Sequence, residues 1–292
     1  MKQKVALVLG SGGARGAAHI GVIRELVAQG YEISSISGSS MGALVGGVYA
    51  AGKLDEYETW LRSLSKTDIF NLVDFTLSRS GIIKADKVLK EIQKFIPDQK
   101  IEDLPIKYAA VATDFNHKKE VVITEGSLFE AIRASISIPM LITPLRKNET
   151  LFVDGGVLNP VPTNRVSRQE GDILIAVDAG AQIPYKKPKV DADQNWGYFE
   201  KLTKGKLKRF QRRLSQLFPF KRDEKKGYFN LIVETAHLML SQITDLTLNS
   251  NPPDLLIQIS IESCGTFDFY KAVEIIELGK QTTHESIGKL KI

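Results

Sequence analysis

The sequence predicts an α/β fold of three layers, α/β/α, with a mostly parallel central sheet. Short apolar runs alternate with helical patterns along most of the chain, and the apolar run at 5–9 is followed at once by a glycine-rich loop. Strands that alternate with helices favour a largely parallel sheet with helices on both faces. Apolar residues make up 43% of the 292-residue chain and charged residues 25%, a composition typical of a globular protein with a sizeable core.

The hydrophobic pattern predicts the individual elements in order. Apolar and β-branched runs indicate strands, and apolar residues at helical spacing indicate helices. Strands are expected at 5–9, 33–37, 108–113, 120–124, 150–153, 173–178 and 255–261, and helices near 17–29, 41–51 and 228–248. In such sheets ligands bind at the carboxyl ends of the strands. The glycine loop, Ser40 and Asp154 are all expected at these ends.

The chain is expected to form one domain, residues 1–292, in three parts. These are a core at 1–183, an insertion at about 184–226, and a helix-strand-helix at 227–292 that completes the core. The chain carries a net charge of +5, yet residues 201–226 alone hold eleven Lys or Arg against two acids. The basic character is therefore confined to the insertion.

Cysteine content and hydropathy indicate the compartment. The single cysteine, Cys264, excludes an internal disulfide and favours a reducing compartment with a buried side chain. Residues 1–9 are read as leading into the first core strand rather than as a signal peptide. No window approaches the ~18 consecutive apolar residues of a membrane-spanning helix. We therefore expect a cytoplasmic protein whose membrane contact is peripheral, on the inner face.

Residues Gly38 to Gly42 match the pattern G-x-S-x-G, the nucleophile elbow, in which a serine occupies a sharp turn between a strand and a helix. A β-branched run precedes the turn, and small and apolar residues suited to a closely packed helix follow it. The pattern predicts Ser40 as a nucleophile, with glycines at 38 and 42 because side chains there would clash. The alternative is a serine that only caps the following helix.

The loop Gly10 to Gly16 lies between a strand and a helix, the setting of a phosphate or dinucleotide site. The match fails because Arg15 stands where G-x-G-x-x-G needs its third glycine, and because no G-x-x-x-x-G-K-[ST] is present. The remaining interpretation is that Gly12 and Gly13 let backbone N–H groups converge on a developing negative charge, as in an oxyanion hole. Arg15 is expected to fix the loop or to face an anionic head group, unless it is simply a solvated or salt-bridged side chain.

A serine nucleophile needs a base, and none of the four histidines has a convincing setting. A triad in the order Ser, Asp, His would leave only His237 or His284, each in a helix that suggests a structural or solvated role. Asp154 follows a core strand and precedes Gly155 and Gly156. Partial burial would raise the pKa of this carboxyl and make it a better base. Standing alone, Asp-Gly would indicate only a turn.

Three blocks taken together resemble the patatin-like phospholipase family. They are the glycine loop with Ala14-Arg15-Gly16, the elbow Gly38-Ser39-Ser40-Met41-Gly42, and Asp154-Gly155-Gly156. The resemblance extends to Arg133-Ala134-Ser135-Ile136-Ser137-Ile138-Pro139, to Asn159-Pro160-Val161-Pro162 and, more loosely, to the last forty residues. It covers most of the chain outside 184–226. Ser11 departs from the family pattern, which commonly has glycine there.

The resemblance implies a Ser-Asp dyad without histidine. Ser40 attacks an acyl ester while Asp154 takes its proton, and water then hydrolyses the acyl-enzyme without metal or cofactor. The implied oxyanion hole and its support come from backbone N–H groups near Gly12, Gly13 and Ala14, with Arg15 and Gly16 beside them. The implied substrates are phospholipids or lysophospholipids. Alternatives are a transacylase with the same dyad and a non-catalytic membrane adaptor.

The basic insertion has its own pattern. At 206–218 apolar residues recur every three or four positions with Lys and Arg between them, which is typical of a basic amphipathic helix. We expect residues 199–222 to contact an anionic membrane surface. The alternative is a helix whose apolar stripe packs on the core. Nucleic acid is not expected, because the segment shows no recognised binding motif.

Overall fold

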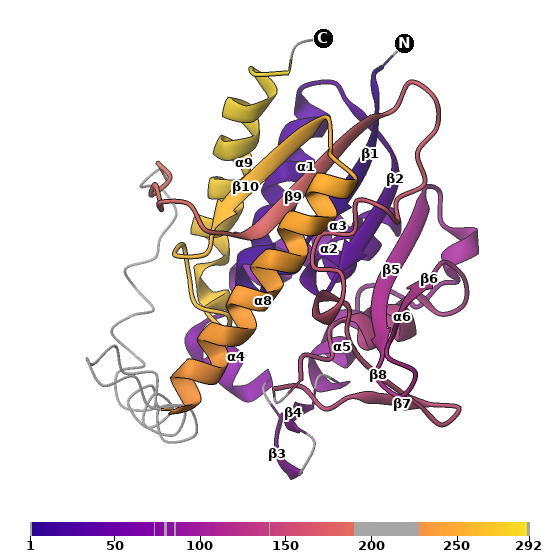
Figure 1. Ribbon diagram of the computed structural model, residues 1–292, viewed down its shortest axis with the longest axis vertical. Helices are drawn as coiled ribbons and strands as arrows, with labels where there is room; N and C mark the ends of the chain where they lie inside the picture. The colour runs from indigo at the N-terminus through magenta and orange to yellow at the C-terminus, as the bar shows by residue number, and fades with distance from the viewer. Residues whose placement is uncertain are drawn as a thin grey trace.

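A computed structural model describes residues 2–72, 74–78, 81–84, 86–139, 141–189 and 228–290 of the chain. The basic segment at 199–222, with its predicted amphipathic helix, lies outside these residues. Both termini lie at one end of the molecule, and the carboxyl ends of the parallel strands lie toward the other (Figure 1).

The predicted sheet is present, and it is mostly parallel. In the described part of the chain it has eight strands in the order β10-β9-β1-β2-β5-β8-β7, with β6 paired to β5. The first five strands of this order run parallel, whereas β6, β8 and β7 pair antiparallel. Their bounds are β1 Lys4–Leu9, β2 Glu32–Ser39, β5 Lys107–Asp114, β6 Lys119–Ile123, β7 Leu145–Lys147, β8 Thr150–Asp154, β9 Ile173–Ala181 and β10 Leu255–Ser260. The seven strands expected from the sequence are thus confirmed, and β7 is an addition.

The antiparallel direction of β8 determines where Asp154 lies. Strand β2 pairs with β5 up to Ser39 opposite Val111, and β8 pairs with β5 from Asp154 opposite Ala112. Because β6 occupies the other edge of β5 over these residues, β2 and β8 share one edge and meet end to end. Asp154 is therefore brought to the end of β2 by a strand that runs against the parallel strands, and not by one that runs with them.

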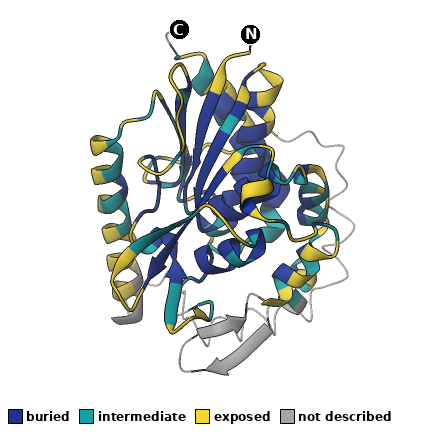
Figure 2. Ribbon diagram, turned by 90° about the vertical axis from the view of Figure 1, so that its right-hand side faces the viewer, coloured by how far each residue is buried: buried dark blue, intermediate teal, exposed yellow. Residues whose placement is uncertain are grey.

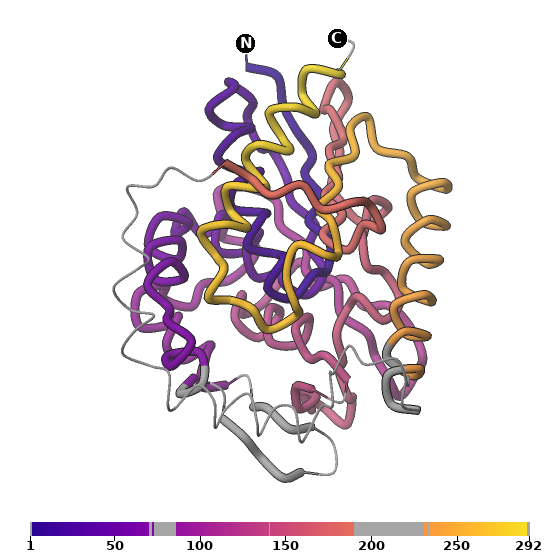
Figure 3. The backbone as a smooth tube through the Cα atoms, turned by 90° about the vertical axis from the view of Figure 1, so that its left-hand side faces the viewer, coloured from indigo at the N-terminus to yellow at the C-terminus, as the bar shows by residue number. Residues whose placement is uncertain are grey.

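Helices cover both faces of the sheet (Figures 2 and 3). One face carries most of them, and the other carries α8, which lies apart at the left of Figure 2 and at the right of Figure 3. The helices of the first face and its edge are α1 Ala18–Ala28, α2 Met41–Ala50, α6 Leu128–Ser135 and α9 Ala272–Ile287, whereas α8 spans Tyr228–Ser250. Among the described residues, none of the helices is both long enough and apolar enough to cross a bilayer.

A region without a sequence prediction follows α2. It contains helices α3 Leu54–Ser63, α4 Lys66–Leu72 and α5 Asp86–Gln93, with a hairpin of strands β3 Asp74–Ser78 and β4 Gly81–Lys84 between α4 and α5. Short 3₁₀ turns complete the fold: η1 Gly13–Ala17, η2 Ile101–Asp103, η3 Gly155–Val157 and η4 Phe269–Lys271. The helices of this region line the pocket beside Ser40.

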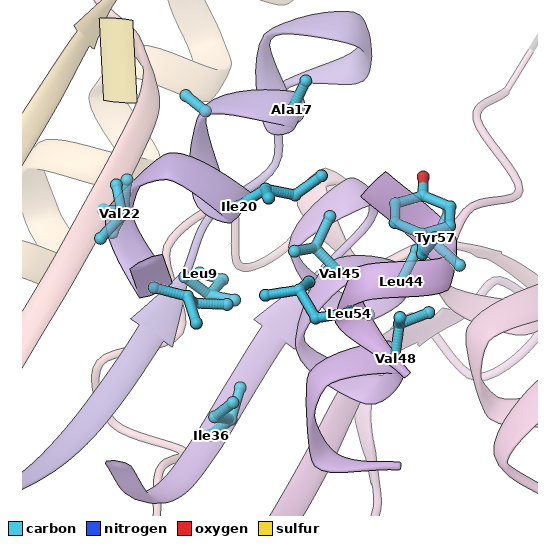
Figure 4. Close-up of a cluster of buried hydrophobic side chains, with 14 of the residues drawn as sticks. Leu9, Ala17, Ile20, Val22, Ile36, Leu44, Val45, Val48, Leu54 and Tyr57 are labelled. Atoms are coloured by element: carbon cyan, nitrogen blue, oxygen red, sulfur yellow. The ribbon is translucent and has the colours of Figure 1, made fainter. Parts of the chain in front are cut away.

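The larger core lies between the sheet and α1, α2 and α9. Figure 4 shows Leu9 of β1 and Ile36 of β2 facing Ile20 of α1 and Val45 of α2, all of them almost fully buried. The opposite face has a smaller core of Ala6, Val8, Val161, Leu174 and Ala176, against which Leu248 of α8 packs. The glycine loop and the elbow therefore stand on strands that are buried on both faces.

Helices α1 and α9 cross at unusually close range. A methyl group at Gly21 would lie 1.9 Å from the carbonyl oxygen of Ile276, and one at Gly279 would lie 2.1 Å from that of Ala18. Each glycine thus admits the backbone of the other helix. Since α1 directly follows the glycine loop, this crossing also fixes the base of the loop.

We expect Gly279→Ala to lower the free energy of unfolding by roughly 1–3 kcal/mol, because the added methyl overpacks the crossing. Urea or guanidinium unfolding curves measure the effect. Gly288→Ala, at the end of the same helix, is the matched control, since its methyl would have no contact closer than 3.8 Å. Equal unfolding midpoints for the two variants would contradict the close crossing.

Candidate active site

Ser40 lies on a sharp turn between β2 and α2, as the elbow pattern predicts. Its backbone has φ 55° and ψ −124°, in the left-handed region that a non-glycine residue occupies only at a cost. The turn is tight on both sides. A methyl group at Gly42 would lie 2.0 Å from the carbonyl oxygen of Leu9, and one at Gly38 would lie 2.5 Å from that of Gly42. The two glycines are therefore required by space.

The side chains of Ser40 and Asp154 meet directly. Ser40 Oγ lies 2.5 Å from Asp154 Oδ2, and the N–H of Gly156 donates to Asp154 Oδ1 at 2.7 Å. Ser40 and Asp154 are both buried, with relative exposures of 4% and 5%. A methyl group at Gly155 would lie 2.0 Å from the carbonyl oxygen of Val111, so only glycine lets this turn approach β5.

The carboxyl of Asp154 is desolvated, and this sets its acidity. Burial raises its pKa from the ordinary 3.8 to about 7, although the hydrogen bonds from Ser40 and Gly156 act in the opposite direction. Among the described residues no Lys, Arg or His side chain pairs with it. The carboxylate can therefore accept a proton near neutral pH, which an ordinary aspartate cannot do.

The glycine loop has two backbone donors without a partner in the described part of the chain, and one of the two residues, Gly13, lines the same pocket as Ser40. The N–H groups of Gly12 and Gly13 donate to no other group in the described part of the chain, and Gly13 has φ 55°. The N–H of Ser11, by contrast, donates to Pro160 at 2.8 Å and that of Ala14 to Thr266 at 2.9 Å. Of the three oxyanion donors that the resemblance implies, Gly12 and Gly13 remain candidates. The N–H of Ala14 does not, because it already donates to the carbonyl oxygen of Thr266.

Arg15 points into the molecule. Its side chain is buried, and its Nε and Nη1 donate to the carbonyl oxygens of Ala179 at 2.8 Å and of Cys264 at 3.1 Å. Arg15 therefore ties the loop to β9 and to the segment after β10. This burial is incompatible with the alternative that Arg15 faces a lipid head group. A methyl group at Gly16 would lie 2.2 Å from Met41 Cγ, so the loop also packs on the elbow.

The four histidines lie apart from the pair. His19 is fully buried and Nε2 contacts the carbonyl oxygen of Gly10 at 2.8 Å, while burial lowers its pKa to about 4. His117 and His284 bind carboxylates elsewhere, and His237 lies on α8. No histidine donates to or accepts from Ser40 or Asp154. Within the described residues, no three His, Cys, Asp or Glu side chains are arranged to hold a metal ion.

A largely apolar pocket opens beside Ser40. Its volume is about 960 Å³, part of which is open to solvent, and both Ser40 and Gly13 line it. The remaining wall comes mainly from the unpredicted helices and from two loops: Tyr57, Trp60, Leu61, Leu64, Ile69, Leu72, Val88, Leu89, Ile136, Ile138, Ile142, Phe267 and Phe269. None of the described residues that line it is charged. A long hydrocarbon chain could therefore lie there with its ester at Ser40.

Sequence reasoning missed Ser135 as a residue of this site. The run 133–139 is part of the family resemblance, which assigns Ser135 no role, yet Ser135 Oγ accepts a hydrogen bond from the N–H of Ser40 at 2.9 Å. The signal was present in the sequence. Hydroxyl side chains alternate with apolar ones from Ser135 to Ile138, and buried hydroxyl groups in an apolar setting need specific partners.

Comparison with known proteins decides the family. A profile of the family described as "Patatin-like phospholipase" matches residues 7–166, which include Ser40, Asp154 and the glycine loop. The chain belongs to the patatin-like phospholipase family. This membership supports lipid acyl hydrolase activity in general terms and agrees with the fold.

Two relatives and one solved structure show how far the similarity to known proteins extends. An uncharacterized NTE family protein of Mycobacterium tuberculosis is 35% identical over 341 residues, covering 99% of this chain and 92% of the relative. Lysophospholipase NTE1 of Yarrowia lipolytica is 27% identical over 299 residues, covering 99% of this chain and only 20% of the much longer relative. The crystal structure of VipD from Legionella pneumophila aligns with a TM-score of 0.48 at 14% identity, over 99% of this chain and 67% of VipD.

We expect kcat/KM for ester hydrolysis to rise about tenfold per pH unit below pH 7 and to level off above it. The reason is that Asp154, with a pKa of about 7, can take the Ser40 proton only in its ionised form. Initial rates at saturating and limiting substrate across pH 4–9 measure the profile. His117→Asn should keep the same acid limb, and an acid limb near pH 4 would contradict a buried carboxylate base.

Proposed function

We propose that this protein is a serine acyl hydrolase that cleaves acyl esters of phospholipids or lysophospholipids. The observation that carries the proposal is the 2.5 Å contact between Ser40 Oγ and the buried carboxylate of Asp154 at the wall of an apolar pocket. A nucleophile in direct contact with a base of matched pKa is the minimum that acyl transfer needs. Family membership supports the same reaction class.

In the first half-reaction, Ser40 Oγ attacks the ester carbonyl carbon and its proton passes to Asp154 Oδ2. The carbonyl oxygen becomes an oxyanion, for which the N–H groups of Gly12 and Gly13, without a partner in the described part of the chain, are the candidate donors. Collapse of this intermediate breaks the bond to the alcohol oxygen, which takes the proton from Asp154. The products are an ester of Ser40 and a free alcohol.

In the second half-reaction, water attacks the Ser40 ester and gives its proton to Asp154. The second oxyanion uses the same donors, and its collapse returns the proton to Ser40 Oγ and releases a fatty acid. Asp154 thus begins and ends each half-reaction ionised. A single carboxyl can perform both transfers because burial places its pKa near neutrality.

The pocket supports a long acyl chain as the part of the substrate that is recognised. Aromatic and aliphatic side chains from α3, α4 and α5 form its wall, and the chain of a lipid would bury its surface against them. The polar head group would then remain toward solvent. A substrate of this kind is a phospholipid or lysophospholipid, as relatives named lysophospholipase also suggest.

We further propose peripheral contact with an anionic membrane through residues 199–222. The eleven basic residues at 201–226 lead directly into α8. In the described part of α8, Leu231, Ile232, Leu238 and Met239 are exposed by 41–59%. Basic charge next to exposed apolar surface favours binding to an interface of anionic lipid.

We expect a fluorophosphonate probe to modify Ser40, as detected by mass spectrometry of the intact protein and its peptides. Ser40→Ala should lose both the adduct and hydrolysis of long-chain lysophospholipid, because the nucleophile is gone. Asp154→Asn should fold as the wild type does and lose at least about 10³-fold in kcat. Absence of a Ser40 adduct in the wild type would overturn the proposal. Acyl transfer to an added alcohol in preference to water would instead identify a transacylase.

We expect deletion of 199–222 to reduce sedimentation with vesicles that contain phosphatidylserine, and to leave hydrolysis of a soluble short-chain ester unchanged. The reason is that the deletion removes basic charge without touching the described site. Vesicles of phosphatidylcholine alone are the control for charge. Unchanged binding to anionic vesicles would show that this segment is not the membrane contact.

A further inference from the structure

The segment of residues 133–139, together with Ile142, has two sides with different neighbours. Ile136, Ile138 and Ile142 line the apolar pocket, whereas Ser135 and Ser137 are fully buried on the side of Ser40 and Asp154. The segment leaves α6 at its last residue, Ser135, and runs past the ends of β2 and β8. It therefore contacts both the pocket, which Ser40 also lines, and the backbone of the reacting pair.

Ser135 holds the backbone of the nucleophile. Its Oγ accepts the N–H of Ser40 at 2.9 Å and donates to the carbonyl oxygen of Val111 at 2.5 Å. Val111 pairs with Ser39, the residue before the nucleophile. One hydroxyl thus links the elbow to the neighbouring strand, and its exposure is 0%.

Ser137 holds the backbone of the base. Its carbonyl oxygen accepts the N–H of Asp154 at 2.9 Å. Its Oγ donates to the carbonyl oxygen of Arg133 at 2.8 Å and accepts from Arg133 Nη1 at 2.6 Å. Arg133 also donates to Asp86, the first residue of α5, at 2.8 Å. The two members of the pair are thus attached to positions 135 and 137 of one short segment.

The attachment at Ser40 supports an unfavourable conformation. With φ 55°, the Ser40 backbone would relax unless its neighbours fixed it. Removing the Ser135 hydroxyl would leave a buried N–H of Ser40 without its acceptor. The nucleophile would then be free to turn away from Asp154 although its own side chain is intact.

We propose that Ser135 is a positioning residue for the reaction: through the hydrogen bond from the Ser40 N–H, it keeps the nucleophile aligned with Asp154 and the pocket. This inference rests on the proposed function of the pair. Ser135 has no hydrogen bond to Ser40 Oγ or to the Asp154 carboxylate. The pocket is lined by its neighbours Ile136 and Ile138 and not by Ser135 itself. Its loss should therefore reduce kcat and leave KM for a long-chain ester nearly unchanged.

The test compares Ser135→Ala with Ser260→Ala. Ser260 is the matched control because its buried Oγ also donates to a carbonyl oxygen, that of Ile183 at 2.6 Å, and accepts a backbone N–H, that of Glu262 at 3.2 Å. Sites are counted by titration with a fluorophosphonate, so that misfolded protein does not enter kcat. We expect a 10- to 100-fold fall in kcat for Ser135→Ala, the effect of one lost buried hydrogen bond. Ser260→Ala should keep wild-type kcat.

Two further variants guard against failure to fold. Ser135→Cys preserves the volume but provides a weak acceptor, so it should lose kcat as Ser135→Ala does. Ser135→Thr retains the hydroxyl and should recover at least part of it. Equal kcat for the alanine variants at 135 and 260, or a loss seen only in KM, would overturn the inference. If the wild type itself shows no Ser40 adduct and no turnover, the proposed function fails instead.

Discussion

The structure depends on one contact, the hydrogen bond between the hydroxyl of Ser40 and the buried carboxylate of Asp154. A carboxylate out of water and without a cation is costly to keep ionised, which is why its pKa rises to about 7. The same cost bears on the proposed chemistry, because an aspartate with an ordinary pKa would be a weaker base toward the Ser40 hydroxyl. The tight elbow at Ser40 and the glycines after Asp154 hold the hydroxyl and the carboxylate 2.5 Å apart.

The sheet supplies that geometry by an end-to-end meeting of strands. If all the strands were parallel, Ser40 and Asp154 would follow the carboxyl ends of two different strands. The loops after those strands would then set the positions of the two side chains. The antiparallel β8 instead runs toward β2 along one edge of β5, so that the last residue of each strand lies near the other. The relative position of Ser40 and Asp154 is therefore set by the pairing of β2 and β8 with β5, and the loops that follow only have to lead the chain away from the sheet.

The sequence predicted those parts of the fold that local pattern determines. Strands such as 5–9 and 173–178 are continuous apolar runs, and the glycine blocks restrict the chain wherever they occur. It could not predict that Ala14 gives its N–H to Thr266, that Arg15 turns inward, or that α3 to α5 wall the pocket, since each depends on partners distant in sequence. The direction of β8 is of the same kind, because the run 150–153 looks alike in either orientation.

The hydrogen bonds that join the glycine loop to residues 264–266 bear on the order in which the site can form. Ala14 is held by Thr266 and Arg15 by Cys264, and α9, which fixes α1, comes later still. A nascent chain that has emerged only through Asp154 therefore lacks the residues that hold Ala14 and Arg15 in place. Formation of this part of the site thus follows the synthesis of residues far beyond Ser40 and Asp154.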